Sequence, residues 1–141
     1  MSATTDVWAV GNAYEPYIGR WSRLVAHEFI DWLSPARGDS WLDVGCGTGA
    51  MTATVLATGA PAHVCSVDAS AAFVAFARGQ ISDSRATFVV ADARRLPLPA
   101  ASADVVVSGL VLNFVPQPEL ALAEMARIVR PAGTVAIYVW D

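Results

Sequence analysis

The sequence has no lysine: all nine basic residues are arginines, and they are scattered along the chain. With 13 acidic residues, the formal net charge is −4. Binding to the phosphate backbone of nucleic acid requires clustered positive charge. We therefore expect no nucleic-acid partner.

Cysteine and histidine are nearly as scarce, with two of each in 141 residues. Cys46 and Cys65 do not form a Cys-x-x-Cys pair, so the spacing supports neither a zinc site nor a redox pair. A free cysteine is commonly a small buried hydrophobic residue, and we expect that role for both. No metal site is predicted.

Long hydrophobic runs are missing too. Residues 104–115, among the longest, are interrupted by Ser108 and Asn113 and are too short to span a bilayer. No basic segment followed by an apolar stretch opens the chain, so we expect a cytoplasmic protein without a membrane partner.

Hydrophobic residues make up 55% of the chain and charged residues 16%, which predicts a folded protein. We expect a flexible lead-in over residues 1–13 and one domain over residues 14–141.

What the chain does have is a glycine-rich stretch at residues 40–50, which reads Ser-Trp-Leu-Asp-Val-Gly-Cys-Gly-Thr-Gly-Ala. This pattern predicts a strand, a tight turn and a helix, in which glycine lets the backbone lie against a ligand. A dinucleotide fingerprint would be met by Gly45, Gly47 and Ala50. Asp43, however, stands at the end of the strand, where a carboxylate repels a pyrophosphate and attracts a cation.

Residues 42–49, Leu-Asp-Val-Gly-Cys-Gly-Thr-Gly, closely resemble the first motif of class I S-adenosylmethionine-dependent methyltransferases. The cofactor of that family carries a sulfonium and an ammonium group and no phosphate, which agrees with the charge argument. The resemblance implies that Asp43, Gly45, Cys46 and Gly47 bind S-adenosylmethionine.

Residues 14–23 resemble the Tyr…Gly-Arg-Trp-Ser stretch of small-molecule methyltransferases of the ubiquinone-biosynthesis type. This resemblance implies that Tyr14 stacks on or hydrogen-bonds to the cofactor. It also implies that Arg20 reaches the carboxylate of its amino acid part. The alternative is an N-terminal flap that packs on the surface without a binding role.

A second predicted strand, over residues 62–68, ends in Asp68, 23 positions after Gly45. An acid about 20 residues after the first glycine meets the ribose hydroxyls in such folds, so we place Asp68 and the adjacent Ala69 in the cofactor site. Asp68 could instead cap the following helix, although Ser70 could fill that role.

A third predicted strand, over residues 85–92, ends in Asp92, 24 positions after Asp68. The family resemblance implies that Asp92 contacts the adenine amino group and that Ala93 donates its backbone N–H to the ring. The alternative is an ordinary loop aspartate.

The remaining elements follow from apolar periodicity and turn residues. Further helices are expected over residues 21–33, 50–58, 70–80 and 118–130, and further strands over 40–44, 103–108 and 134–140. The first helix should bury Leu24, Val25, Phe29, Trp32 and Leu33, and the last should bury Leu122, Met125, Ile128 and Val129. Five strands alternating with helices predict an α/β, doubly wound parallel sheet of Rossmann-like type in the order 3-2-1-4-5.

Ligands bind outside the carboxyl ends of the strands in such sheets. By family resemblance, Ser108 and Gly109 stand beside the transferable methyl group, where the fourth strand leaves the sheet. The apolar residues that follow them could line an acceptor pocket or the core: Leu110, Val111, Leu112 and Phe114.

The resembled family has a sixth and a seventh strand, for which this sequence has no counterpart. The fifth strand is therefore expected to form an open, apolar edge. We expect either a chain truncated at its C-terminus or a homodimer that covers this edge.

The predicted function is methyl transfer from S-adenosylmethionine to a small molecule by in-line displacement. Positioning supplies most of the acceleration, so no catalytic residue is named. The Asn-Pro-Pro motif of nucleobase amine methyltransferases is absent after the fourth strand.

Two alternatives to this function remain. One is an NAD(P)-dependent oxidoreductase, for which the Tyr-x-x-x-Lys pair is lacking. The other is a protein that binds S-adenosylmethionine or S-adenosylhomocysteine without turnover.

Overall fold

The computed structural model describes residues 20–141, so the expected lead-in over residues 1–13 lies outside it. Five parallel strands form one sheet in the order β3-β2-β1-β4-β5, which confirms the predicted topology. The strands are β1 (Ser40–Val44), β2 (His63–Asp68), β3 (Ala86–Val90), β4 (Ala103–Gly109) and β5 (Val129–Tyr138). The helices are α3 (Arg20–Leu33), α4 (Ala50–Thr58), α5 (Ala71–Gln80) and α6 (Pro118–Ile128), with a short 3-10 helix η2 (Leu112–Phe114).

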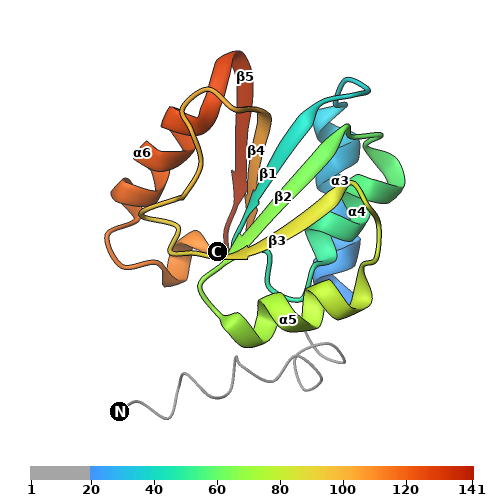
Figure 1. The fold of residues 1–141 in the computed structure, drawn as a ribbon, viewed down its shortest axis with the longest axis horizontal. Helices are drawn as coiled ribbons and strands as arrows, with labels where there is room; N and C mark the ends of the chain where they lie inside the picture. The colour runs from blue at the N-terminus through green and yellow to red at the C-terminus, as the bar shows by residue number, and fades with distance from the viewer. Residues whose placement is uncertain (1–19) are drawn as a thin grey trace.

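Helices cover both faces of the sheet: α3, α4 and α5 lie on one side and α6 on the other (Figure 1). Successive residues of β1 therefore point into two different cores. Trp41 packs in a cluster with Ile30 of α3 and Val55 of α4, whereas Leu42 packs with Met125 of α6. This two-sided burial explains why the central strands are apolar without alternation.

The buried face of α3 differs from the predicted one. Leu24 and Trp32 are 56% and 71% exposed, and the buried positions are Ser22, Ala26 and Ile30. α3 packs against α4, and small side chains at a helix contact allow the two axes to approach closely. Phe29 and Leu33 pack against the core cluster as predicted, whereas the prediction for Leu24, Val25 and Trp32 is wrong.

The buried face of α6 also differs from the predicted one, but to a smaller extent. Met125 and Ile128 are buried as predicted, but Leu122 is exposed and Ala121 takes its place in the core. Pro118 stands in the first turn, where its missing N–H has no consequence.

β5 begins earlier than predicted, at Val129 rather than Thr134. Val129 pairs with Ala103 and Thr134 pairs with Val105, so residues 130–133 form a bulge in the strand instead of a turn before it. Within this bulge Ala132 has φ +65°, a left-handed conformation that costs energy for any residue with a Cβ.

Across residues 20–141, no helix is long and apolar enough to cross a membrane.

Candidate functional site

A cavity of about 800 Å³ opens at the carboxyl ends of the strands. It lies between the segments that follow β1, β2 and β3 and those that follow β4 and β5. The chain proceeds from β1 to one edge of the sheet and later from β4 to the other, so this cavity is at the topological switch point. Its volume is within the roughly 300–1,000 Å³ of small-molecule sites.

Most of the predicted site residues line this cavity: Asp43, Gly45, Cys46, Gly47, Asp68, Ala69, Asp92 and Ala93. Two described residues do not: Arg20, the exposed first residue of α3, and Ser108. Tyr14 lies outside the described residues. The three acids that are far apart in sequence are therefore brought to one cavity.

The glycine loop is held by hydrogen bonds to the neighbouring strand. The backbone N–H groups of Gly45 and Cys46 both donate to the Val67 carbonyl, at 2.8 and 2.9 Å. Gly45 has φ +76°, and a Cβ at this position would overlap the Val111 side chain. Glycine is thus required because the segment after β4 comes directly against the loop.

Asp68 joins the glycine loop to the start of α5. Its Oδ2 accepts from the Gly47 N–H at 2.9 Å, and its Oδ1 accepts from the Ser70 N–H at 2.8 Å. Each carboxylate oxygen can accept a further bond, so both remain able to receive a hydroxyl group. Ser70, rather than Asp68, caps α5 by accepting from the Phe73 N–H. Burial raises the pKa of Asp68, while its two backbone hydrogen bonds oppose this shift.

Asp43 is more deeply enclosed, with 1% of its surface exposed. Its Oδ2 accepts from Thr52 Oγ1 at 2.8 Å. Burial, followed by repulsion from Asp68, raises the pKa of Asp43 to about 7, against the opposing effect of the Thr52 hydrogen bond. In the described part of the chain no basic side chain forms an ion pair with it. A cation in the cavity would supply the missing counter-charge.

Asp92 has the opposite environment. It is half exposed, and Arg94 binds it through Nε and Nη2, with an Nη2–Oδ2 distance of 2.8 Å. Hydrogen bonds from the side chain and then the backbone of Arg94 lower the pKa of Asp92 to about 2. Arg94 also lines the cavity, a placement that the sequence reading did not predict. The Asp-x-Arg spacing directly after a strand could have indicated this pairing.

Ser108 does not reach the cavity because β4 continues for one more residue. It still pairs with Ile137 of β5 and is fully buried, whereas Gly109 lines the cavity. A Cβ at Gly109 would overlap the Tyr138 hydroxyl group, so the two strands end in close contact there.

The wall beyond β4 is mainly apolar. Of the residues predicted to line a pocket there, Leu110, Val111 and Phe114 do so, whereas Leu112 packs in the core beside α6. Tyr138 and Trp140 also line the cavity. Sequence patterns did not indicate them because they arrive from the far end of the chain.

The Asn113 side chain fastens the segment after β5 to this wall. Its amide nitrogen donates to the Trp140 carbonyl at 3.0 Å, and its Oδ1 accepts from the Trp140 N–H at 2.9 Å. These reciprocal bonds join η2 to the end of the sheet and keep Trp140 at the cavity.

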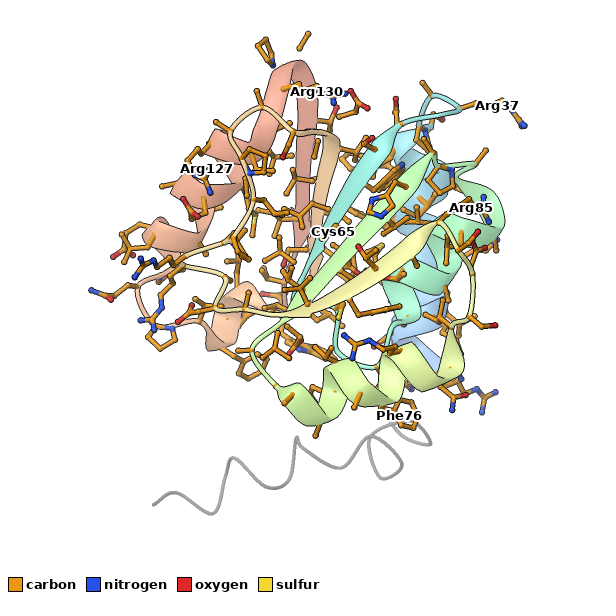
Figure 2. The ribbon with its side chains drawn as sticks, in the orientation of Figure 1. Arg37, Cys65, Phe76, Arg85, Arg127 and Arg130 are labelled. Carbon is orange, nitrogen blue, oxygen red and sulfur yellow. The ribbon has the colours of Figure 1, made fainter. Side chains whose placement is uncertain are left out.

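The described residues contain no metal centre. Among residues 20–141, no group of three or more His, Cys, Asp or Glu side chains could hold a metal ion. Both cysteines are free thiols, and Cys65 lies within the sheet (Figure 2). Arg37, Arg85, Arg127 and Arg130 are spread around the periphery in the same view.

The fold and the cavity define a Rossmann-like α/β domain with a cavity of ligand size at the switch point of its sheet. Residues 42–137 match the family of methyltransferase domains. The demethylmenaquinone methyltransferase of Clavibacter sepedonicus is 35% identical over 106 residues, which are 74% of this chain and 42% of that protein. The chain spans less than half the length of the curated relatives it matches.

Two solved structures show the same fold. One belongs to the complex between the Haloferax volcanii Trm112 methyltransferase activator and a methyltransferase. Its TM-score is 0.84 at 25% identity, and the match covers 99% of this chain and 61% of that one. The other is the [4+2]-cyclase SpnF, with a TM-score of 0.74 at 26% identity, covering 82% of this chain and 43% of that one. The present chain belongs to the class I S-adenosylmethionine-dependent methyltransferases.

Proposed function

We propose that residues 14–141 form a cofactor-binding domain that holds S-adenosylmethionine in the 800 Å³ cavity and serves methyl transfer to a small molecule. The observation that carries this proposal is the convergence of Asp43, Asp68 and Asp92 on one cavity beside the glycine loop.

The charges of the cavity support this cofactor. Arg94 neutralises Asp92, which leaves Asp43 and Asp68 without a basic partner among the described ion pairs. A ligand with a sulfonium and an ammonium group complements these two carboxyl groups, whereas the pyrophosphate of NAD would add two negative charges beside them. Asp68 would accept the ribose hydroxyl groups, and Asp92 would accept the adenine amino group beside the Ala93 N–H.

Methyl transfer in this cavity would proceed by positioning. S-adenosylmethionine would supply an activated methyl group, while Asp43 would face its cationic part and Asp68 would hold its ribose so that the methyl group points toward the acceptor. Holding both reactants in the attack geometry supplies much of the acceleration.

A small apolar acceptor fits the wall formed by Leu110, Val111, Phe114, Tyr138 and Trp140. The named relative from Clavibacter acts, according to its name, on demethylmenaquinone. That likeness supports a small-molecule acceptor here and does not identify it. A methyl-transfer assay with a panel of small metabolites would test this step, and turnover of none of them would contradict it.

The cofactor assignment is tested by calorimetry with S-adenosylmethionine and with NAD. We expect binding of the first and not of the second. Asp68→Asn should weaken binding by roughly 10- to 100-fold, because hydrogen bonds to a charged acceptor contribute about 1.5–3 kcal/mol. Asp83→Asn is the matched control, since Asp83 pairs with Arg85 away from the cavity. Preferential binding of NAD, or equal affinities of the two variants, would contradict the assignment.

A second candidate function is binding of the same cofactor without methyl transfer. The likeness to SpnF, which is named a [4+2]-cyclase, supports a role other than methyl transfer for a chain with this fold. Calorimetric binding with no methyl transfer to any acceptor would favour this alternative.

A further inference from the structure

Two buried hydroxyl groups lie behind Asp43, and the proposed function so far makes no use of them. Thr52 Oγ1 lies 2.8 Å from Asp43 Oδ2, and Ser66 Oγ lies 2.6 Å from Thr52 Oγ1. Thr52 comes from α4 and Ser66 from β2, and neither has any exposed surface. Neither residue lines the cavity, so both can reach a ligand only through Asp43.

The direction of these hydrogen bonds follows from the number of protons. An ionised carboxylate can only accept, so the single hydroxyl proton of Thr52 is donated to Asp43. Thr52 then has no proton left for Ser66, and Ser66 must donate to Thr52. The two hydroxyl groups therefore form a chain whose dipoles both point their positive ends toward the carboxylate. When Asp43 is protonated, the two hydrogen bonds no longer need to run in this direction, because a neutral carboxyl group can itself donate a hydrogen bond.

The surroundings of Asp43 make these two hydroxyl groups important for its charge. The titratable groups that interact electrostatically with it are Asp68, Cys46 and, from the other face of the sheet, Cys65, and none of them is basic. β4 presents Val107 at the paired position, and α4 presents Thr52. The two interactions that lower the pKa of Asp43 both come from Thr52. One of these is the hydrogen bond from the Thr52 hydroxyl group and the other comes from the Thr52 backbone, so Thr52 is the residue of the described chain that favours the ionised form of Asp43.

We propose that Thr52 and Ser66 are positioning residues that keep Asp43 ionised and aimed at the cationic part of the nucleoside ligand. This inference rests on the proposed function. It implies that the hydroxyl chain affects affinity for a charged ligand and not affinity for the nucleoside itself. It also implies that affinity for the charged ligand increases with pH as Asp43 loses its proton.

The test compares S-adenosylmethionine with the uncharged nucleoside 5′-methylthioadenosine by calorimetry between pH 5.5 and 7.5. The upper limit stays below the ordinary pKa of an α-amino group, about 7.7–8.0, so that the ligand keeps its charge. In the wild type, affinity for S-adenosylmethionine should increase over this range while affinity for methylthioadenosine stays constant. Thr52→Val should weaken S-adenosylmethionine binding at pH 7 by roughly three- to tenfold, because loss of the hydroxyl bond raises the pKa of Asp43 and so lowers its ionised fraction at this pH.

The same variant should move the pH midpoint of binding upward, since the bond it removes lowers the pKa of Asp43. Ser66→Ala should move the midpoint in the same direction by less, because Ser66 acts through Thr52. Thr52→Ser keeps the hydroxyl group and should restore the wild-type profile. Thr54→Val is the matched control: Thr54 is a buried threonine of the same helix whose hydroxyl donates to the Ala50 carbonyl.

The outcomes separate the inference from the function on which it rests. If the wild type binds both ligands but Thr52→Val has the same pH profile as Thr54→Val, the positioning role is wrong. If Thr52→Val weakens both ligands equally, its effect is structural and the inference is also wrong. If the wild type binds neither ligand, the proposed function is contradicted and the inference is withdrawn with it.

Discussion

Asp43, Asp68 and Asp92 are the same residue type at neighbouring strand ends, yet they are three different carboxyl groups. Burial raises the pKa of Asp43 to about 7 and also raises that of Asp68, whereas Arg94 lowers that of Asp92 to about 2. The difference comes from depth and partner, since Asp43 is enclosed and Asp92 is half exposed beside a guanidinium group. Near neutral pH, Asp43 is thus the acid among these three whose charge a ligand can most readily change.

The raised pKa of Asp43 predicts that the protein without ligand loses stability as pH increases from 5 to 8. The folded state keeps this proton up to about pH 7, whereas an unfolded aspartate releases it near 3.8. The folded state therefore binds more protons in this window, and the free energy of unfolding falls as pH increases. Urea denaturation at pH 5, 6, 7 and 8 measures the slope.

Asp43→Asn is the control for this prediction, because an amide has no proton to lose. The variant should remove most of the slope, with the remainder due to Asp68, whose pKa is raised in the same direction. A free energy of unfolding that is constant or rises between pH 5 and 8 in the wild type would contradict the account of Asp43.

At the scale of elements, β5 contains the clearest conflict between local preference and observed conformation. The bulge over residues 130–133 places Ala132 at φ +65° and Gly133 so close to β4 that a Cβ there would lie 2.6 Å from the Asp104 carbonyl oxygen. The strand resumes regular pairing at Thr134. Glycine is thus required at position 133 because β4 comes so close, whereas Ala132 is held in a strained left-handed conformation.

Ala132→Gly should therefore stabilise the protein by about 0.5–1 kcal/mol. A left-handed conformation costs an L-residue about 1–2 kcal/mol, and part of that gain is lost to the greater freedom of glycine in the unfolded chain. Ala123→Gly, an exposed position inside α6, is the matched control and should destabilise by about 1 kcal/mol. Chemical denaturation measures the change in the free energy of unfolding for both variants. If both variants were stabilised or both were destabilised, the strain assigned to Ala132 would be contradicted.

At the scale of the whole molecule, the sheet ends in β5 at one edge and in β3 at the other. On or just after β5, Val135, Val139 and Trp140 are between 38% and 49% exposed. β5 also has ten residues against five in β3, so it offers the longer row of unpaired backbone groups. Long apolar edge strands tend to pair with other chains.

This edge predicts that the 141-residue chain on its own associates in a concentration-dependent manner. Val135→Lys should reduce that association, because a charge on an edge strand opposes further pairing. Val90→Lys at the end of β3 is the matched control and should leave it unchanged. Sedimentation velocity at several concentrations measures both, and a wild type that stays monomeric throughout would contradict the prediction.

The sequence by itself determined the order and type of the elements and the composition of the glycine loop. The signals for these features, such as a glycine after an apolar run or a serine before a helix, lie within a few neighbouring residues. For the same reason the sequence predicts that the strand-end acids Asp43, Asp68 and Asp92 lie together at the carboxyl ends of the strands.

Only the tertiary structure decided which helix faces are buried and that Trp140 reaches the cavity. Each of these depends on the distance between segments that are far apart in the chain or on the depth of a side chain. The sequence pattern therefore selected Trp32 for burial on α3, whereas close contact with α4 selected the smaller Ala26. The pKa of Asp43 is likewise a property of its enclosure by α4 and β2, which no local motif records.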